Sequence, residues 1–173
     1  YLESIQYWRD PDNGMWEERE ELHASSIGAC LAGLKMIKKA GIAKVPQYLI
    51  YAGRRALNNI LPYETPGKKI DLALLSLIYP YNIVTKKQRE QILRLVEGNL
   101  VRERGVIRYP GDQYYNENGE AEWTFGFPWL AIIFKKLRNY KKHAEYIKKT
   151  ISVLNERGEM PELYFSGTNR HNE

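Results

Sequence analysis

The chain has 173 residues, of which 43% are hydrophobic and 27% charged, a composition that excludes extensive disorder and permits one globular domain with a core. The single cysteine, Cys30, excludes an internal disulfide, and the lack of an 18-residue apolar run argues against a transmembrane helix. The net charge of +5 comes mainly from lysine doublets spread along the chain, which favours a solvated surface over a nucleic-acid groove.

Apolar residues at three- and four-residue steps predict helices in the first half of the chain. The first helix is expected from about Glu21 to Lys39, with Gly41 as its stop and Cys30 as a small buried side chain on its apolar stripe. The second is expected between Pro46 and Pro62. Residues 70–79 are apolar on nearly every side, which indicates a short buried helix, although periodicity alone leaves a strand open.

The second half of the chain continues the helical pattern. Thr85 and Gln88 have the spacing of a capping box, which predicts a helix. Its buried face is expected to be Ile92, Leu95, Val96 and Leu100. Pro128 suits the first turn of a further helix, and Asn139 can cap a last helix ending at Gly158. With about six helices and no series of β-hairpins, the expected class is all-α, as one domain over residues 1–173 without a second.

Three long loops separate these helices, at residues 10–19, 105–126 and 158–173. Long loops in compact domains are usually functional or disordered. The middle loop carries Tyr109, Tyr114, Tyr115 and Trp123, and so many aromatic rings are unfavourable in water. Because tyrosine and tryptophan combine a flat apolar face with a polar edge, this loop is expected to line a site suited to sugars.

Each loop holds residues that could carry chemistry. Trp16 precedes Glu17, and an apolar ring beside a carboxyl group favours the protonated form that a general acid needs, although acids before a helix also suit its dipole. Arg108 could bind sugar hydroxyls while Asp112 orients it, or the two could simply pair and pin the loop. Glu162 follows a proline, a position where a glutamate is most often exposed and idle.

Together these segments resemble glycoside hydrolase family 15, which includes glucoamylases, glucodextranases and related trehalases. Asp12-Asn-Gly-Met-Trp-Glu-Glu-Arg, followed by His23 and Ser25-Ser26, resembles the family's general-acid segment. Arg108-Tyr-Pro-Gly-Asp-Gln-Tyr-Tyr-Asn116 is similar to the stretch that lines the sugar subsite, and Gly158-Glu-Met-Pro-Glu-Leu-Tyr164 to the general-base segment. Residues 69–77 also resemble a helix of this family.

The resemblance implies an inverting, exo-acting hydrolase that releases glucose from α-glucosidic bonds without a metal or another cofactor. Glu17 would be the general acid and Glu162 the general base, with room for a water that sets their carboxyl groups roughly 6.5–9.5 Å apart. The substrate, an α-glucan or oligosaccharide, would contact a set of polar and aromatic side chains: Trp16, Glu18, Arg108, Tyr109, Asp112, Tyr115 and Trp123. Glu18 could also keep Glu17 protonated through its charge.

The resemblance also has gaps. Leu163 stands where a glutamine usually follows the base, and residues 116–123 leave the alignment of Asn116 and Trp123 open. The family fold is an (α/α)6 barrel of two concentric helix layers, of which this chain would supply the second half. Since half a barrel exposes apolar faces, we expect self-association or a missing barrel half as partner. The N-terminal residues show no signal pattern, which favours a cytoplasmic location.

Two other classes of function stay open. One is a non-catalytic regulatory or glycan-binding module, like the glucoamylase-like part of phosphorylase kinase regulatory subunits, and it would release no reducing sugar. The other is a helical scaffold for protein or nucleic acid, whose nucleic-acid binding would weaken steeply with salt. The preferred linkage, whether α-1,4, α-1,6 or trehalose-type, is not encoded in these motifs.

Overall fold

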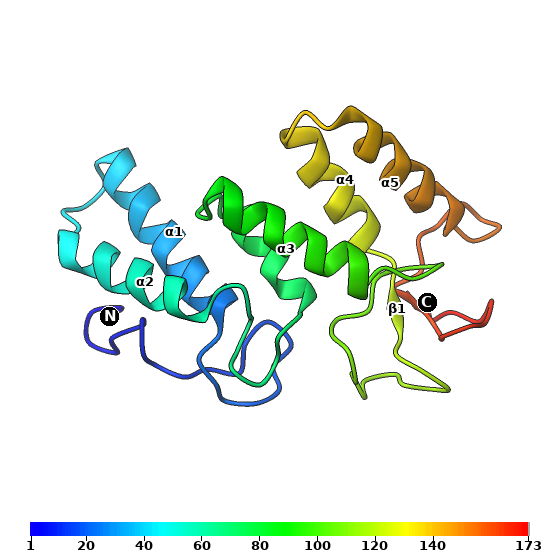
Figure 1. Ribbon diagram of the computed structural model, residues 1–173, viewed down its shortest axis with the longest axis horizontal. Helices are drawn as coiled ribbons and strands as arrows, with labels where there is room; N and C mark the ends of the chain where they lie inside the picture. Colours follow the sequence, from blue (N-terminus) through cyan, green and yellow to red (C-terminus); the bar gives the residue numbers. More distant parts are fainter. Residues whose placement is uncertain (173) are drawn as a thin grey trace. The chain divides into compact units, whose positions relative to one another are not determined.

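The computed structural model describes residues 1–172, which are mostly helical (Figure 1). Two strands of two residues each, β1 (Glu122–Trp123) and β2 (Leu163–Tyr164), form a small antiparallel ribbon. The all-α class predicted from the sequence is therefore confirmed. The helices in chain order are α1 (Ala24–Ala40), α2 (Gln47–Ile60), the 3-10 helix η1 (Leu72–Leu77), α3 (Lys86–Asn99), α4 (Gly126–Lys136) and α5 (Tyr140–Ser152).

Several predicted helix ends are confirmed in atomic detail. Gly41 ends α1 in the left-handed region, with φ of 66°, and its N–H reaches the last carbonyls of the helix. The Thr85 and Gln88 side chains bond each other's backbone N–H at 2.9 and 3.3 Å, which is the capping box at the start of α3. Asn139 accepts a hydrogen bond from the N–H of Lys142 and caps α5.

Other predictions about the elements were wrong. The first helix begins at Ala24 rather than Glu21, and its first turn carries no acid. The last helix ends at Ser152, so Gly158 lies in the following loop. Cys30 is only half-buried.

None of the helices within residues 1–172 is long and apolar enough to cross a membrane.

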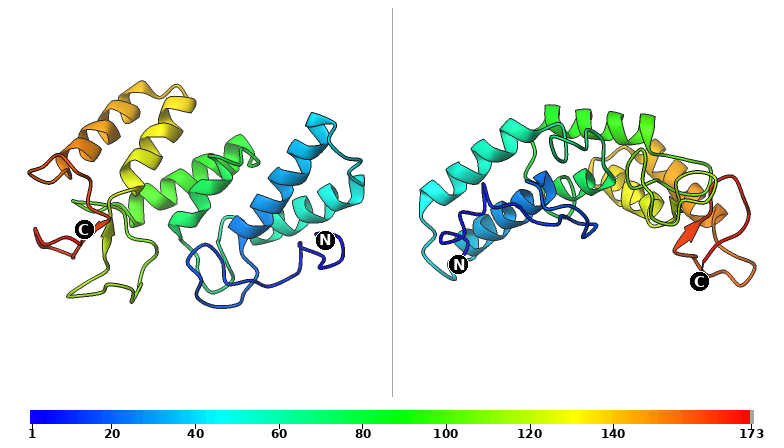
Figure 2. Two further views of the ribbon diagram at one scale, coloured as in Figure 1. Left: turned by 180° about the vertical axis from the view of Figure 1, so that it is seen from behind. Right: turned by 90° about the horizontal axis from the view of Figure 1, so that it is seen from below.

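The chain divides into two compact units, and the prediction of one domain over the whole chain stays a prediction. The first unit comprises residues 1–69 and 76–92, with α1 packed against α2 (Figure 2). Small residues permit its close contacts. A Cβ on Gly28 would lie 2.2 Å from Leu77 Cδ2, and one on Gly53 would lie 2.0 Å from the hydroxyl oxygen of Tyr7.

The second unit comprises residues 70–75 and the chain from Leu93 onward. Here α4 and α5 form a helix pair, visible in Figure 1 and in the view from behind in Figure 2. The Phe134 and Tyr146 rings stack across the pair, with centroids 5.6 Å apart. In the ribbon, Trp123 lies opposite Leu163 and belongs to a buried cluster with Phe165, so the ribbon anchors the loops that carry Arg108 and Glu162.

Candidate functional site

The structure places the predicted site residues in two groups, one in each unit. The first unit holds Glu17 with its neighbours in the loop before α1. The second unit holds Glu162 with the aromatic loop. The members are Trp16, Glu17 and Glu18 in the first group, and Arg108, Tyr109, Asp112, Tyr115, Trp123 and Glu162 in the second.

A backbone bridge closes the loop that carries Glu17. Asp12 and Glu21 pair as an antiparallel bridge, with both backbone hydrogen bonds at 2.9 Å. The Asp12 carboxylate accepts further hydrogen bonds from the N–H of Gly14 at 2.6 Å and from the Ser26 hydroxyl at 2.8 Å. The loop is therefore tied both to itself and to α1, and residues 13–20 are presented from a fixed base.

Glu17 lies at the exposed tip of this loop in a left-handed backbone conformation, with φ of 53°. This region disfavours residues other than glycine, by roughly 1–3 kcal/mol, and such residues cluster at functional sites. Trp16 beside it is half-buried. Glu18 forms a salt bridge with Lys68, Nζ to Oε2 2.5 Å, so its charge is partly compensated.

A buried histidine supports the same loop from beneath. His23 is 5% exposed, and its ring lies so close to Gly14 that a Cβ there would be 2.5 Å from the ring. The His23 Nε2 faces the carbonyl oxygen of Arg19 at 3.2 Å, and Nδ1 faces the buried carboxylate of Glu64 at 3.4 Å. Both neighbours are acceptors, and only the protonated ring can donate to both.

The electrostatics of His23 agree with this geometry. Burial by itself would lower the pKa of His23, but the hydrogen bond to Glu64, the Arg19 carbonyl and the nearby charges of Glu64 and Asp12 together raise it above its usual value. The surroundings of His23 therefore favour its protonated form. Glu64 is also bonded by Ser25, through both its N–H and its hydroxyl.

In the second unit, Arg108 and Asp112 form a buried bidentate pair. Arg108 Nε donates to Asp112 Oδ2 at 2.6 Å and Nη2 donates to Oδ1 at 2.7 Å, and the two residues are 5% and 0% exposed. Asp112 also accepts from the N–H of Tyr114 at 3.0 Å. Both interpretations of these residues expected this pair, and a contact of Arg108 with a sugar stays a prediction. The aromatic loop is thus ordered around a fixed guanidinium.

Three aromatic rings surround that guanidinium, at 4.9 Å for Tyr114, 5.4 Å for Trp123 and 5.8 Å for Tyr109. Tyr114 stacks on Trp123 with an interplanar angle of 8°, and Tyr115 meets both rings edge-on. Tyr114 is 54% exposed and Tyr115 is 40% exposed. The cluster therefore has a buried cationic base and an accessible aromatic surface, which we call the aromatic platform (Tyr114, Tyr115 and Trp123).

Glu162 lies beside this platform. Its carbonyl oxygen accepts from the N–H of Thr124 at 3.1 Å, and its exposed carboxylate accepts at Oε2 from the Asn172 amide at 2.8 Å. The pKa of Tyr114 is raised, chiefly by the neighbouring Tyr115 hydroxyl, then by burial, and also by the charge of Glu162. The backbone of Glu162 is therefore held at the strand that carries Trp123 of the platform.

Some supporting residues were not predicted from the sequence. Tyr114 was recognised only as part of an aromatic loop, and it is the most exposed of the three platform residues. Glu64 and Asn172 had no local signal, because their partners lie far away in sequence or across a turn.

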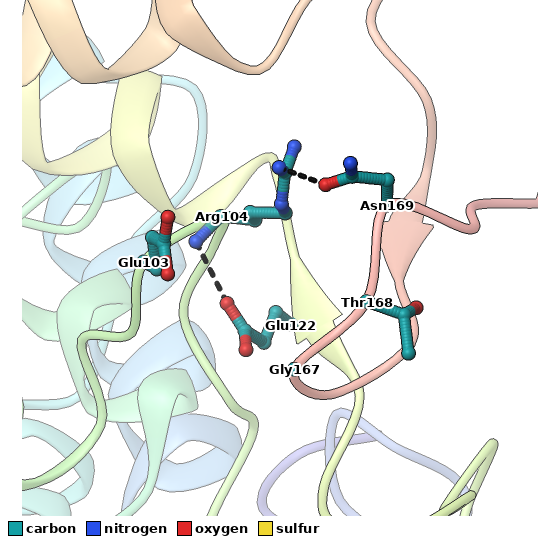
Figure 3. A pocket seen from close by; sticks show the side chains of 6 residues that line it. All are labelled: Glu103, Arg104, Glu122, Gly167, Thr168 and Asn169. Atoms are coloured by element: carbon teal, nitrogen blue, oxygen red, sulfur yellow. Dashed lines mark hydrogen bonds between the residues drawn. The ribbon is translucent and has the colours of Figure 1, made fainter.

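The opposite face of β1 carries a polar pocket of about 210 Å³ (Figure 3). Glu122 alternates with Trp123 along the strand and faces this pocket, where its Oε2 accepts from the N–H of Arg104 at 2.7 Å. The Arg104 guanidinium reaches Asn169 from there. None of the residues predicted to bind substrate lines it. In residues 1–172, no cluster of three or more His, Cys, Asp or Glu side chains could hold a metal ion.

Two curated proteins are similar to this chain in sequence. An uncharacterized glycosyl hydrolase of Methanocaldococcus jannaschii is 24% identical over 90% of this chain and 29% of its own length. The skeletal-muscle regulatory subunit alpha of rabbit (Oryctolagus cuniculus) phosphorylase b kinase is 25% identical over 95% of this chain and 16% of its own. No protein-family model matches.

Solved structures show the same fold. A wild-type glycosidase has a TM-score of 0.78 at 19% identity, and a glycosidase variant in complex with glucose has 0.77 at 19%. Each alignment covers 95% of this chain and 47% of the glycosidase chain. The chain therefore has a glycosidase-like fold, consistent with part of an all-α toroid, and spans about half the length of these glycosidases.

Proposed function

We propose that the chain carries the acid–base pair of an inverting glycoside hydrolase of the family 15 type, an exo-acting enzyme that releases glucose from α-glucosidic bonds. The observation that carries the proposal is the small ribbon, which holds the Glu162 backbone at the strand of Trp123, and Trp123 belongs to the aromatic platform around Arg108. Such a surface suits a sugar ring, with apolar faces for its C–H bonds and fixed polar groups for its hydroxyls. A glucose complex of a structurally similar glycosidase supports this choice.

In the proposed reaction Glu17 is protonated and Glu162 is ionised. Glu17 donates its proton to the glycosidic oxygen as the bond from that oxygen to the anomeric carbon breaks. A water attacks the same carbon from the opposite face, and Glu162 accepts the proton that the water loses. The product has inverted configuration, one water is consumed, and proton transfer through solvent resets the pair.

The strained loop tip supports the role of Glu17. A residue other than glycine keeps a left-handed backbone conformation only where its surroundings hold it. Here the backbone bridge between Asp12 and Glu21 and the His23 ring hold the loop of Glu17. An exposed carboxyl group at a rigid tip is suited to reach a substrate oxygen. The half-buried Trp16 and the paired Glu18 would complete the substrate contacts.

The test is substitution of each carboxyl group in the full-length protein with maltooligosaccharides as substrate. Glu17→Gln and Glu162→Gln should each lower turnover by about 10²–10⁴-fold while sugar binding persists. Glu20→Gln and Glu156→Gln change exposed carboxylates outside the proposed pair and serve as matched controls. Near-wild-type turnover in either member of the pair would remove that residue from the mechanism.

A second candidate function is favoured by the likeness to a phosphorylase b kinase regulatory subunit. In this alternative the aromatic platform binds a glycan but no bond is cleaved. The two functions differ in one readout, because only the hydrolase releases reducing sugar from starch-type substrates. Binding without release, in the full-length protein, would establish the regulatory class instead.

Since the chain spans about half of the matched glycosidases, we propose that its activity needs further barrel helices, from a longer chain or a second copy. Apolar faces without those helices would associate in water. The isolated chain should therefore be poorly soluble. A monodisperse monomer in sedimentation that melts cooperatively in calorimetry would contradict this expectation.

A further inference from the structure

Glu162 begins a short hairpin that returns at Asn172. The N–H of Phe165 donates to the carbonyl of Arg170 at 3.0 Å, and the N–H of Asn172 donates to the carbonyl of Leu163 at 3.3 Å. Tyr164 and His171 form the bridge between these pairs. Asn172 is thus placed opposite the base segment by the backbone of the hairpin itself.

Both the oxygen and the nitrogen of the Asn172 side-chain amide form hydrogen bonds. Its Oδ1 accepts from the N–H of Leu163 at 3.0 Å, and its Nδ2 donates to Glu162 Oε2 at 2.8 Å. The backbone N–H needs an acceptor and the carboxylate needs a donor, so this orientation of the amide satisfies both partners and the flipped one satisfies neither. The amide therefore connects the backbone next to Glu162 with the end of its side chain.

This contact makes the two carboxylate oxygens of Glu162 inequivalent. Among residues 1–172, Asn172 is the one that hydrogen-bonds the Glu162 side chain, and it uses Oε2 alone. Oε1 is left open to accept a proton from water. An exposed glutamate otherwise samples many rotamers, and fixing one of them costs side-chain entropy. A prior hydrogen bond meets part of that cost before substrate arrives.

We propose that Asn172 is a positioning residue for Glu162, which fixes the carboxylate with Oε1 directed at the attacking water. The inference rests on the proposed role of Glu162 as general base. Asn172 touches neither the sugar nor the water in this account, so its effect must pass through Glu162. It should appear in kcat rather than in KM.

The test is a double-mutant cycle in the full-length protein with maltose as substrate. Asn172→Ala should lower kcat about 10–100-fold, with KM changed less than about twofold. In the Glu162→Gln background, the same substitution should cause no further loss. Asn172→Asp keeps the acceptor for Leu163 but loses the donor and adds a like charge, so it should lower kcat at least as much while the hairpin stays folded.

Asn169→Ala, in the same hairpin and away from Glu162, is the matched control and should leave kcat unchanged. An equal loss from Asn172→Ala in both backgrounds, or an unchanged kcat in Asn172→Asp, would overturn the positioning role while leaving the general base in place. Full activity of Glu162→Gln alone would instead overturn the proposed function, and the inference with it.

Discussion

Replacing Asp112 by alanine would leave the Arg108 guanidinium buried without its bidentate partner. Arg108 is 5% exposed, so water cannot replace the lost carboxylate, and the N–H of Tyr114 loses its acceptor as well. Removing one member of a buried ion pair costs about 3–5 kcal/mol. For a domain of this size that corresponds to a fall in Tm on the order of 10 °C.

The assay is thermal unfolding followed by circular dichroism, with urea unfolding as a check. The double variant Arg108→Met/Asp112→Leu should recover most of the loss, because it removes the unpaired charge along with its partner. Glu90→Ala breaks the exposed Lys86–Glu90 pair and should cost less than about 1 kcal/mol. A loss of less than about 1 kcal/mol in Asp112→Ala would refute the view that this pair holds the aromatic loop.

Three further outcomes follow from the geometry. Because the folded-state pKa of His23 is raised, the interaction of His23 with Glu64 stabilises the fold fully below the unfolded pKa of about 6.5 and is lost as the pH rises through the folded pKa. The Tm should therefore fall over this pH interval, and it should fall less in His23→Gln. Equal slopes of Tm against pH in the two proteins would argue against a charged His23. A Cβ at Gly105 would lie 2.5 Å from the backbone of β1, so Gly105→Ala should lower the free energy of unfolding in urea by about 1–3 kcal/mol. A Cβ at Gly98 would meet no atom within 4 Å, so Gly98→Ala should not destabilise the protein. Tyr114→Ala removes the most exposed ring of the platform and should weaken glucose binding about 5–10-fold in calorimetric titration with little change in Tm; unchanged affinity would place the sugar elsewhere.

The helical framework could be predicted because its signals are local. The capping box at Thr85 and Gln88, the stop at Gly41 and the cap at Asn139 each act within one helical turn, and each is formed as predicted. The end of α5 was predicted too late, because Gly158 closes a later turn, with φ of 77°, rather than the helix. Composition at such positions marks a turn without saying which turn.

The small ribbon had no sequence signal. Each strand has two residues, which is too short for an alternating pattern, and the partners Trp123 and Leu163 lie 40 positions apart. The same limit applies to the site. Glu64 supports the loop of Glu17 from a segment far along the chain, and no local pattern around it reports a contact with His23.

The candidate residues themselves could be chosen from the sequence, because motif order and aromatic content suffice for that. Their roles depend on contacts that the motifs do not encode. The bidentate pair of Arg108 and Asp112 agrees with both interpretations of these residues, so a contact of Arg108 with sugar hydroxyls stays a prediction. The motif around Glu18 gave no sign of its salt bridge with Lys68, and the expected effect of the Glu18 charge on Glu17 stays a prediction.

The central claim is that Glu17 and Glu162 act as an inverting acid–base pair, and the anomer of the released sugar tests it most directly. Proton NMR of the full-length protein with maltose, followed from the first minutes of hydrolysis, distinguishes the two anomers before mutarotation mixes them. The reducing-end glucose of maltose leaves as its own equilibrium mixture of anomers, so the excess over that mixture reports the newly formed anomeric centre. Inversion of the α-glucosidic bond predicts an early excess of β-glucose. An early excess of α-glucose would show retention and contradict the pair of roles assigned to Glu17 and Glu162.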